Sequence, residues 1–207
     1  MLTQAQTGKA LQPAKPPIHP ASILSQAFQF RSRVGSSSNE GEPYTVRPVS
    51  SLAWGAMLIL CIAVCFAAAA TGAIATNESV NTWYRMIARP AWTPPDWVFG
   101  PVWTTLYLMM AVAVWLVWCQ AGFRAGRWPL SLFALQLALN VIWSFVFFAL
   151  QSPGWAFGEI LLLWVALAST IVSFWHHSRV AALLLVPYFC WSSFAAVLNF
   201  TIWRLNA

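Results

Sequence analysis

Five long apolar runs dominate the sequence and limit what the chain can fold into. They are Leu52–Ala75, Trp97–Cys119, Leu130–Leu150, Trp155–Trp175 and Val180–Trp203. Their lengths match the roughly 20 residues that a helix needs to cross about 30 Å of hydrocarbon. Strands would show period-2 alternation, which is missing here, and backbone hydrogen bonds in lipid must close within each segment. The runs therefore predict an all-α integral membrane protein, a bundle of five transmembrane helices.

The composition excludes a soluble domain. Hydrophobic residues make up 59% of the chain and charged residues only 8%, whereas soluble domains carry about 25% charged residues. The formal charge of +6 indicates contact with anionic lipid headgroups, so membrane lipids are expected partners. No interleaved basic and aromatic surface is present, and no nucleic acid is expected as a partner.

The chain divides into residues 1–50 and a transmembrane domain of residues 51–207. The first part holds five basic residues, and its two acids are Glu40 and Glu42. It lacks the apolar content for a core. Two interpretations stay open, a disordered basic tail and an organellar targeting segment.

Basic residues near the spans predict an orientation. Eight Lys and Arg residues fall in the tail, the expected loop of residues 120–129 and the turn at residues 176–179. The opposite side holds Arg85, Arg89 and Arg204. The positive-inside rule then places the N-terminus on the cytoplasmic or matrix-like side.

Polar and aromatic residues share one face of the third span. Gln136, Asn140, Trp143 and Phe147 recur at spacings of four, three and four. Amides inside a membrane are costly unless they are paired. They either join helices by hydrogen bonds or line a polar-edged cavity, and both interpretations stay open.

The fifth span carries a second stripe on one helix face, formed by Tyr188, Trp191, Ala195 and Leu198. Two such stripes with amide edges could clasp a flat ligand. Glu159 is the one acid inside a span and lies near the start of the fourth. We expect its carboxylate to reach interfacial water rather than to relay protons.

No catalytic constellation is found. The sequence shows no nucleophile elbow, no paired carboxylates and no glycine-rich phosphate loop. The four cysteines lie in or at the ends of spans and are interpreted as packing residues, so no metal site is expected.

Several motifs in order resemble the translocator protein family, also called TspO or the peripheral benzodiazepine receptor. The first is PAWTPPDWVFGPVWTTLY, from Pro90 to Tyr107. The others are QLALN with Trp143 and Phe147-Phe148 in the third span, and Pro187-Tyr188, Trp191, Phe194-Ala195 and Leu198-Asn199 in the fifth. The resemblance covers about residues 52–206.

The resemblance implies a membrane receptor or regulator. Its expected ligands are porphyrins such as protoporphyrin IX, with sterols as further candidates, and its expected role is to transport or sense the ligand. The resemblance also implies a homodimer, located in a bacterial membrane or in the mitochondrial outer membrane, that requires no cofactor. The implied ligand-binding residues lie below the loop joining the first two spans. They are Trp92, Phe99, Trp103, Asn140, Trp143, Trp155, Leu162, Trp191, Ala195 and Leu198.

Two other functions are implied or conceivable. The resemblance also suggests an enzyme that degrades porphyrin in light, with Trp103 and Trp191 as the reacting residues. A small transporter is disfavoured because the spans lack the buried charges that couple ions to movement. One position departs from the family: Phe200 stands where sterol-binding members carry a tyrosine, which weakens the expectation of sterol binding.

The loop rich in proline has a physical interpretation of its own. Proline fixes φ and lowers the entropy lost on ordering. PAWTPP is therefore expected to form a stiff lid, and Trp92, Trp97 and Trp103 offer ring faces to a planar ligand.

Overall fold

A computed structural model describes residues 51–207, and the predictions for residues 1–50 lie outside this range. All regular secondary structure in the described part is helical, and no strands occur there. Its elements in chain order are α2 (Ser51–Val80), α3 (Trp83–Met86), α4 (Asp96–Ala125), α5 (Arg127–Ser144), the π-helix η1 (Phe145–Ala149), α6 (Pro153–Trp175) and α7 (Arg179–Leu205). Five segments are long and apolar enough to cross a membrane, which confirms the predicted fold class.

Local sequence explains several helix ends. Pro153 is the first residue of α6, where its fixed φ suits a helix and its missing N–H costs nothing. The Ser178 hydroxyl accepts a hydrogen bond from the Ala181 N–H at 3.3 Å and caps α7. Both starts agree with the predicted spans within two residues.

Two helix ends differ from the prediction. The first span was expected to stop at Ala75, but α2 continues to Val80. Thr76 remains helical, and its hydroxyl donates to the Gly72 carbonyl within the same helix. The expected loop of residues 120–129 is mostly helical, because α4 runs to Ala125 across a kink at Gly122. The φ of 61° and ψ of −171° at Gly122 belong to a backbone region that is open to glycine almost alone.

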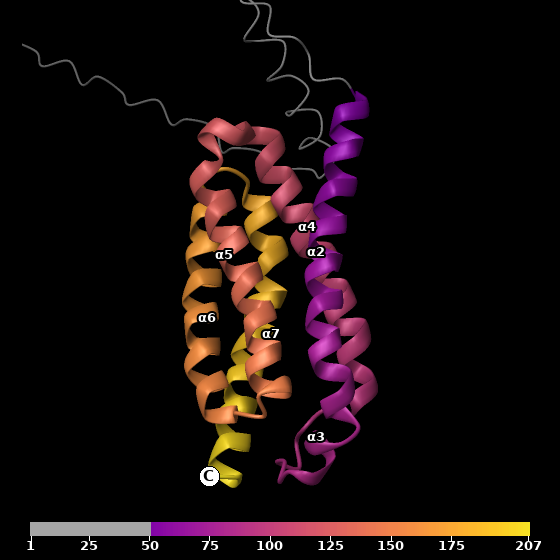
Figure 1. Cartoon of the computed structure of the whole chain (residues 1–207). Helices are drawn as coiled ribbons and strands as arrows, with labels where there is room; N and C mark the ends of the chain where they lie inside the picture. The colour runs from indigo at the N-terminus through magenta and orange to yellow at the C-terminus, as the bar shows by residue number, and fades with distance from the viewer. Residues whose placement is uncertain (1–50) are drawn as a thin grey trace, which may run out of the picture. The chain divides into compact units, whose positions relative to one another are not determined.

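The helices form a bundle in which α6 packs against α5 and α7, while α2 packs against α4 and α5. Helix α4 also contacts α7 and so joins the two sides (Figure 1). The start of α2, the α4–α5 junction and the α6–α7 turn lie at one end of the bundle. The α2–α4 connection, with α3, lies at the other end beside the C-terminus (Figure 1). Basic residues Arg85, Arg89 and Arg204 therefore share one end, as predicted.

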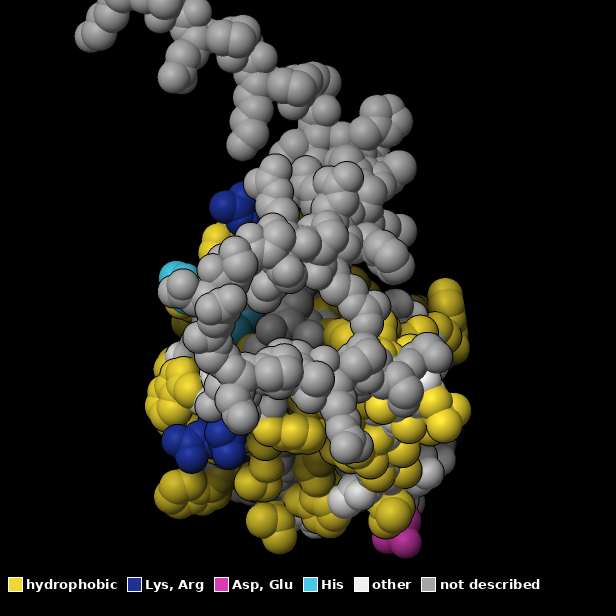
Figure 2. All heavy atoms as spheres, turned by 90° about the horizontal axis from the view of Figure 1, so that it is seen from above, with side chains coloured by type: hydrophobic (Ala, Val, Ile, Leu, Met, Phe, Trp, Pro, Cys, Tyr) yellow, Lys and Arg dark blue, Asp and Glu magenta, His cyan; other side chains and the backbone are white. Residues whose placement is uncertain are grey.

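The outside of the bundle is apolar. Large side chains on α2 such as Ile59, Val64 and Ile74 are half or more exposed. Seen along the bundle, hydrophobic side chains make up most of the visible surface of the described residues, with a few Arg groups among them (Figure 2). Contiguous exposed apolar surface is unusual for a soluble monomer and suits contact with lipid.

The interior contains two apolar clusters. The first is formed mainly by α4 and α7, with smaller contributions from α5, α6 and α2, and those from α2 are Cys61 and Cys65. The second lies toward the α2–α4 connection and contains Tyr84, Phe147 and Leu198. This second cluster ties the connection to the membrane helices and so positions the site described below.

Helices α6 and α7 approach each other closely at Gly154, so we expect a larger side chain there to destabilise the protein. A Cβ atom at Gly154 would lie 2.9 Å from the Trp203 Nε1 and 3.2 Å from the Trp203 Cε2. A Cβ atom at Gly158, on the same helix, would have no neighbouring atom within 4 Å. We expect Gly154→Ala to lower the free energy of unfolding by about 1–3 kcal/mol, as overpacking does. Gly158→Ala is the matched control and should be neutral or stabilising by roughly 0.5–1 kcal/mol. Thermal unfolding of both variants in detergent tests this, and equal melting temperatures would contradict the packing described.

Candidate ligand-binding site

Residues 81–95, called the lid here, connect α2 and α4 and are fastened to the C-terminus. The Ala88 N–H donates to the Asn206 Oδ1 at 2.9 Å, and the Asn206 Nδ2 donates to the Ala88 carbonyl at 2.9 Å. Both bonds link positions 118 residues apart in the sequence. One asparagine thus pairs with the lid backbone much as a neighbouring strand would.

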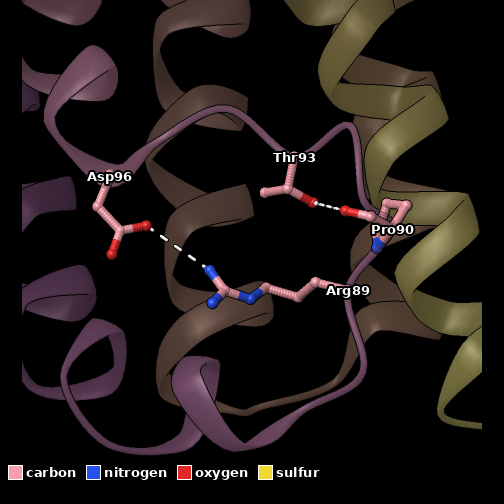
Figure 3. Close-up of polar contacts among 4 residues, drawn as sticks. All are labelled: Arg89, Pro90, Thr93 and Asp96. Atoms are coloured by element: carbon pink, nitrogen blue, oxygen red, sulfur yellow. Dashed lines mark hydrogen bonds and ion pairs between the residues drawn. The ribbon is translucent and has the colours of Figure 1, made fainter.

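The lid also carries its own contacts (Figure 3). The Thr93 hydroxyl donates to the Pro90 carbonyl at 2.7 Å, which closes a tight turn. The Arg89 side chain extends across the loop, and its guanidinium lies 3.6 Å from the Asp96 carboxylate. Together with Pro94 and Pro95, which fix φ, these contacts restrict the lid backbone.

Tyr84 anchors α3, the short helix within the lid. Its ring is buried and contacts Phe147 and Phe148, with centroid distances of 6.2 and 5.7 Å. The Arg89 guanidinium lies 4.8 Å from the centroid of the Tyr84 ring, a cation–π contact. Burial raises the pKa of the Tyr84 phenol, while its hydrogen bond and charge interaction with Arg89 oppose the rise. The ring under Arg89 is therefore neutral at physiological pH.

A chain of ring contacts, called the aromatic path here, runs from the lid into the bundle. Trp92 of the lid contacts Phe194 of α7, Phe194 contacts Trp191, and Trp191 contacts Phe99 of α4. The three centroid distances are 5.8, 5.5 and 5.8 Å. The structure thus brings together Trp92, Phe99 and Trp191, three of the residues expected at the site.

Trp103 belongs to a neighbouring group of rings. Its centroid lies 5.7 Å from that of Tyr107 and 6.0 Å from that of Tyr188. The Tyr107 hydroxyl donates to the Asn140 Oδ1 at 2.5 Å, and the Asn140 Nδ2 donates to the Tyr188 hydroxyl at 2.8 Å. Asn140 therefore joins α4, α5 and α7, as the helix-joining interpretation of this amide requires.

Trp143 is held in a third group. It stacks on Phe147 with a centroid distance of 5.1 Å, and its indole N–H donates to the Asn199 Oδ1 at 3.1 Å. Asn199 in turn donates to the Pro153 carbonyl at 2.7 Å. Leu198 is buried in the same cluster, and Ala195 on α7 is partly buried.

Two expected site residues lie elsewhere. Trp155 is 81% exposed and Leu162 is 62% exposed, both on the outer face of α6. Contact of Trp155 and Leu162 with a ligand stays a prediction, and their exposed location on α6 does not support it. Glu159 lies between them in sequence, and both of its carboxylate oxygens are buried without a hydrogen-bond partner among residues 51–207. This differs from its expected position in interfacial water.

Two cavities open to the surface of the described part of the chain. One, of about 460 Å³, is bounded by the lid and the start of α4. The other, of about 370 Å³, lies between α2 and η1 and includes Glu78, Ser79 and Gln151 in its lining. Neither is lined by any of the ten expected binding residues. The rings of the aromatic path contact one another, so a ligand placed among them must replace ring–ring contacts.

The comparisons decide the family. The family model described as TspO/MBR family matches residues 61–204. The chain belongs to the TspO/MBR family. It is 44% identical over 153 residues to "Tryptophan-rich protein TspO" of Chlorobaculum tepidum, a match that covers 72% of this chain and 95% of the relative. Family membership and the five apolar helices together make it a multi-pass integral membrane protein.

Two further relatives extend the comparison. The human "Translocator protein" is 43% identical over 126 residues, which covers 60% of this chain and 75% of the relative. "Tryptophan-rich sensory protein" of Cereibacter sphaeroides is 35% identical over 151 residues, which covers 73% and 92%. The TspO/MBR resemblance inferred from the motifs is thereby confirmed.

Sequence reasoning missed the polar part of this TspO/MBR lid. Arg85, Arg89 and Asp96 line one cavity, and Asn206 holds the backbone of the lid. Arg89 and Asp96 bracket the proline-rich segment as opposite charges, and that spacing was a usable signal for their pairing. No local pattern indicates that Asn206 reaches Ala88.

The lid contacts predict a change in protease sensitivity. Asn206→Ala removes both hydrogen bonds to Ala88, and an exposed segment with fewer contacts opens more often. We expect tryptic cleavage after Arg85 to become about fivefold faster or more, since two lost hydrogen bonds correspond to about 1–3 kcal/mol. Mass spectrometry of timed digests measures the rate. Asn77→Ala, at an exposed position on α2, is the control; equal rates in both variants would show that Asn206 does not hold the lid.

Proposed function

We propose that this protein is a membrane receptor or sensor that binds a tetrapyrrole such as protoporphyrin IX beneath its lid. The single observation that carries the proposal is the aromatic path from Trp92 through Phe194 and Trp191 to Phe99. The names of its relatives, which include a translocator protein and a sensory protein, support a role in handling or reporting a ligand.

The path suits a flat apolar ligand for a physical reason. Aromatic rings prefer offset-stacked or edge-to-face contacts with centroids about 4.5–7 Å apart. Ring contacts with a macrocycle can replace the ring–ring contacts of the path at similar energy. The path also connects an exposed ring with the interior, because Trp92 is 48% exposed while Trp191 packs against the first cluster. A ligand can therefore enter from the lid end.

Asn140 supports the site indirectly in this proposal. Its amide oxygen and nitrogen are bonded to Tyr107 and Tyr188, so it fixes the ring of Tyr188 against Trp103. Asn140 holds the rings of Tyr188 and Trp103 in place. The ligand is then selected by its shape and by its contacts with the aromatic rings. Trp103 then lies beside the path as a second wall rather than within it.

The position of Phe200 favours tetrapyrroles over sterols. Its ring contacts Phe157 and Trp203, with centroid distances of 5.1 and 6.0 Å, on the lipid-facing side of α7. A phenylalanine offers no hydroxyl to a sterol at this position. We propose that the site binds tetrapyrroles more tightly than sterols.

A binding titration tests the proposal. Trp191→Leu breaks the path at its centre, so we expect affinity for protoporphyrin IX to fall about threefold to tenfold, the equivalent of about 0.5–1.5 kcal/mol of aromatic contact. The shift of the porphyrin absorbance band, measured in nanodiscs, reports binding. Trp128→Leu is the control, because Trp128 is 70% exposed at the opposite end of the bundle. Equal affinities of wild type and both variants would refute a site on the path.

A further inference from the structure

The cavity bounded by the lid and the start of α4 has positively charged side chains in its lining. The aromatic path does not explain their presence. The cavity has a volume of about 460 Å³ and contains Arg85, Arg89 and Asp96 among its lining residues. Two guanidinium groups and one carboxylate leave an excess of one positive charge. The rest of the lining is formed by Ile87, Pro90, Thr93, Pro94 and Pro95.

Arg89 is oriented but only loosely paired. Its guanidinium lies over the Tyr84 ring, and the nearest Asp96 oxygen is 3.6 Å away, beyond the usual hydrogen-bond length. Both partners of this pair are partly exposed, at 30% and 47% for their side chains. Such a pair contributes little to stability. A guanidinium has five N–H donors in a planar fork that matches a carboxylate, so Arg89 can accept another anion at small cost.

Arg85 reaches the same cavity from the last turn of α3. Within residues 51–207 it forms no ion pair. The second guanidinium is therefore available to an anion that Arg89 alone would hold weakly. Two arginines on one cavity suit a ligand with two carboxylates or with one carboxylate held from both sides.

The charged cavity and the aromatic path are built from the same two stretches of chain, the lid and the start of α4. Pro90 and Thr93 line the cavity, and Trp92 between them contacts Phe194 at the start of the path. Asp96 opens α4, and Phe99 at the other end of the path follows one turn later. An amphiphilic ligand can therefore place a flat apolar body on the path and its acidic groups in the cavity.

We propose that Arg85 and Arg89 bind the propionate carboxylates of a tetrapyrrole whose ring system lies on the aromatic path. This inference rests on the proposed function and specifies which end of the ligand faces the lid. It assigns the cavity to recognition of acid side chains, so the preferred ligands are tetrapyrrole carboxylic acids. Asp96 then acts against binding as a competing carboxylate.

The test compares protoporphyrin IX with its dimethyl ester, which keeps the ring system and loses both negative charges. Wild type, Arg85→Gln and Arg89→Gln are titrated with each porphyrin in phosphatidylcholine nanodiscs. Affinities are expressed as variant over wild type for each ligand, so that the different partition of the two porphyrins into lipid cancels. We expect each glutamine variant to lose about threefold to tenfold for the diacid, as removal of one charge-assisted contact predicts, and less than twofold for the ester.

Two further variants sharpen the test. Asp96→Asn removes the competing carboxylate and should bind the diacid more tightly than wild type, with the ester unchanged. Arg204→Gln removes a positive charge at the same end of the bundle, outside the cavity, and is the matched control. It should leave both affinities unchanged.

The outcomes separate the two proposals. Equal losses for diacid and ester would overturn the inference, because the arginines would then act only through the shape of the lid. No change in either arginine variant, with wild type still binding, would also overturn it and leave the tetrapyrrole site standing. Failure of wild type to bind either porphyrin would overturn the proposed function itself.

Discussion

The structure depends on the pairing of Asn140, because a polar side chain inside a bilayer is costly unless it finds partners within the protein. Asn140 pairs with two tyrosine hydroxyls, one from α4 and one from α7. Interhelical hydrogen bonds of this kind contribute modestly, about 0.6 kcal/mol on average, but they also fix the register of three helices. Because Tyr107 and Tyr188 are held in this way, the Trp103 ring that contacts both has a defined position. The aromatic walls of the site follow from a polar contact rather than from apolar packing alone.

The same helix that presents the aromatic residues also holds the lid. Helix α7 contacts the lid through Phe194, which meets Trp92, and through Asn206 just beyond its last turn, which binds Ala88. Pro90 lies between these attachments, and Pro94 and Pro95 follow them, so prolines limit the conformations of the lid backbone. The lid can therefore move as a stiff unit, and any movement that exposes the aromatic path must break contacts with α7. Under the proposed function, ligand entry is therefore coupled to the stability of the C-terminal end of α7.

Much of the fold was predictable because apolar length is a direct consequence of bilayer thickness. The helix ends were less predictable, since Thr76 stays helical and the kink at Gly122 lets α4 continue past its apolar run. The motifs placed Trp92, Phe99 and Trp191 in one expected site, and the structure joins their rings in the aromatic path. The motifs gave no indication that Trp155 and Leu162 face outward. Contacts between distant segments, such as that of Ala88 with Asn206, depend on how helices pack and leave no trace in local sequence.

Hydrogen exchange of the full chain in nanodiscs, with and without protoporphyrin IX, tests the central claim most directly. A ligand on the aromatic path should slow exchange in the lid, in the first turns of α4 and around Phe194 on α7, because these segments provide the Trp92, Phe99 and Trp191 rings. Slower exchange confined to α6 around Trp155 and Leu162, with the lid unchanged, would contradict the account and place the ligand on the outer face of the bundle.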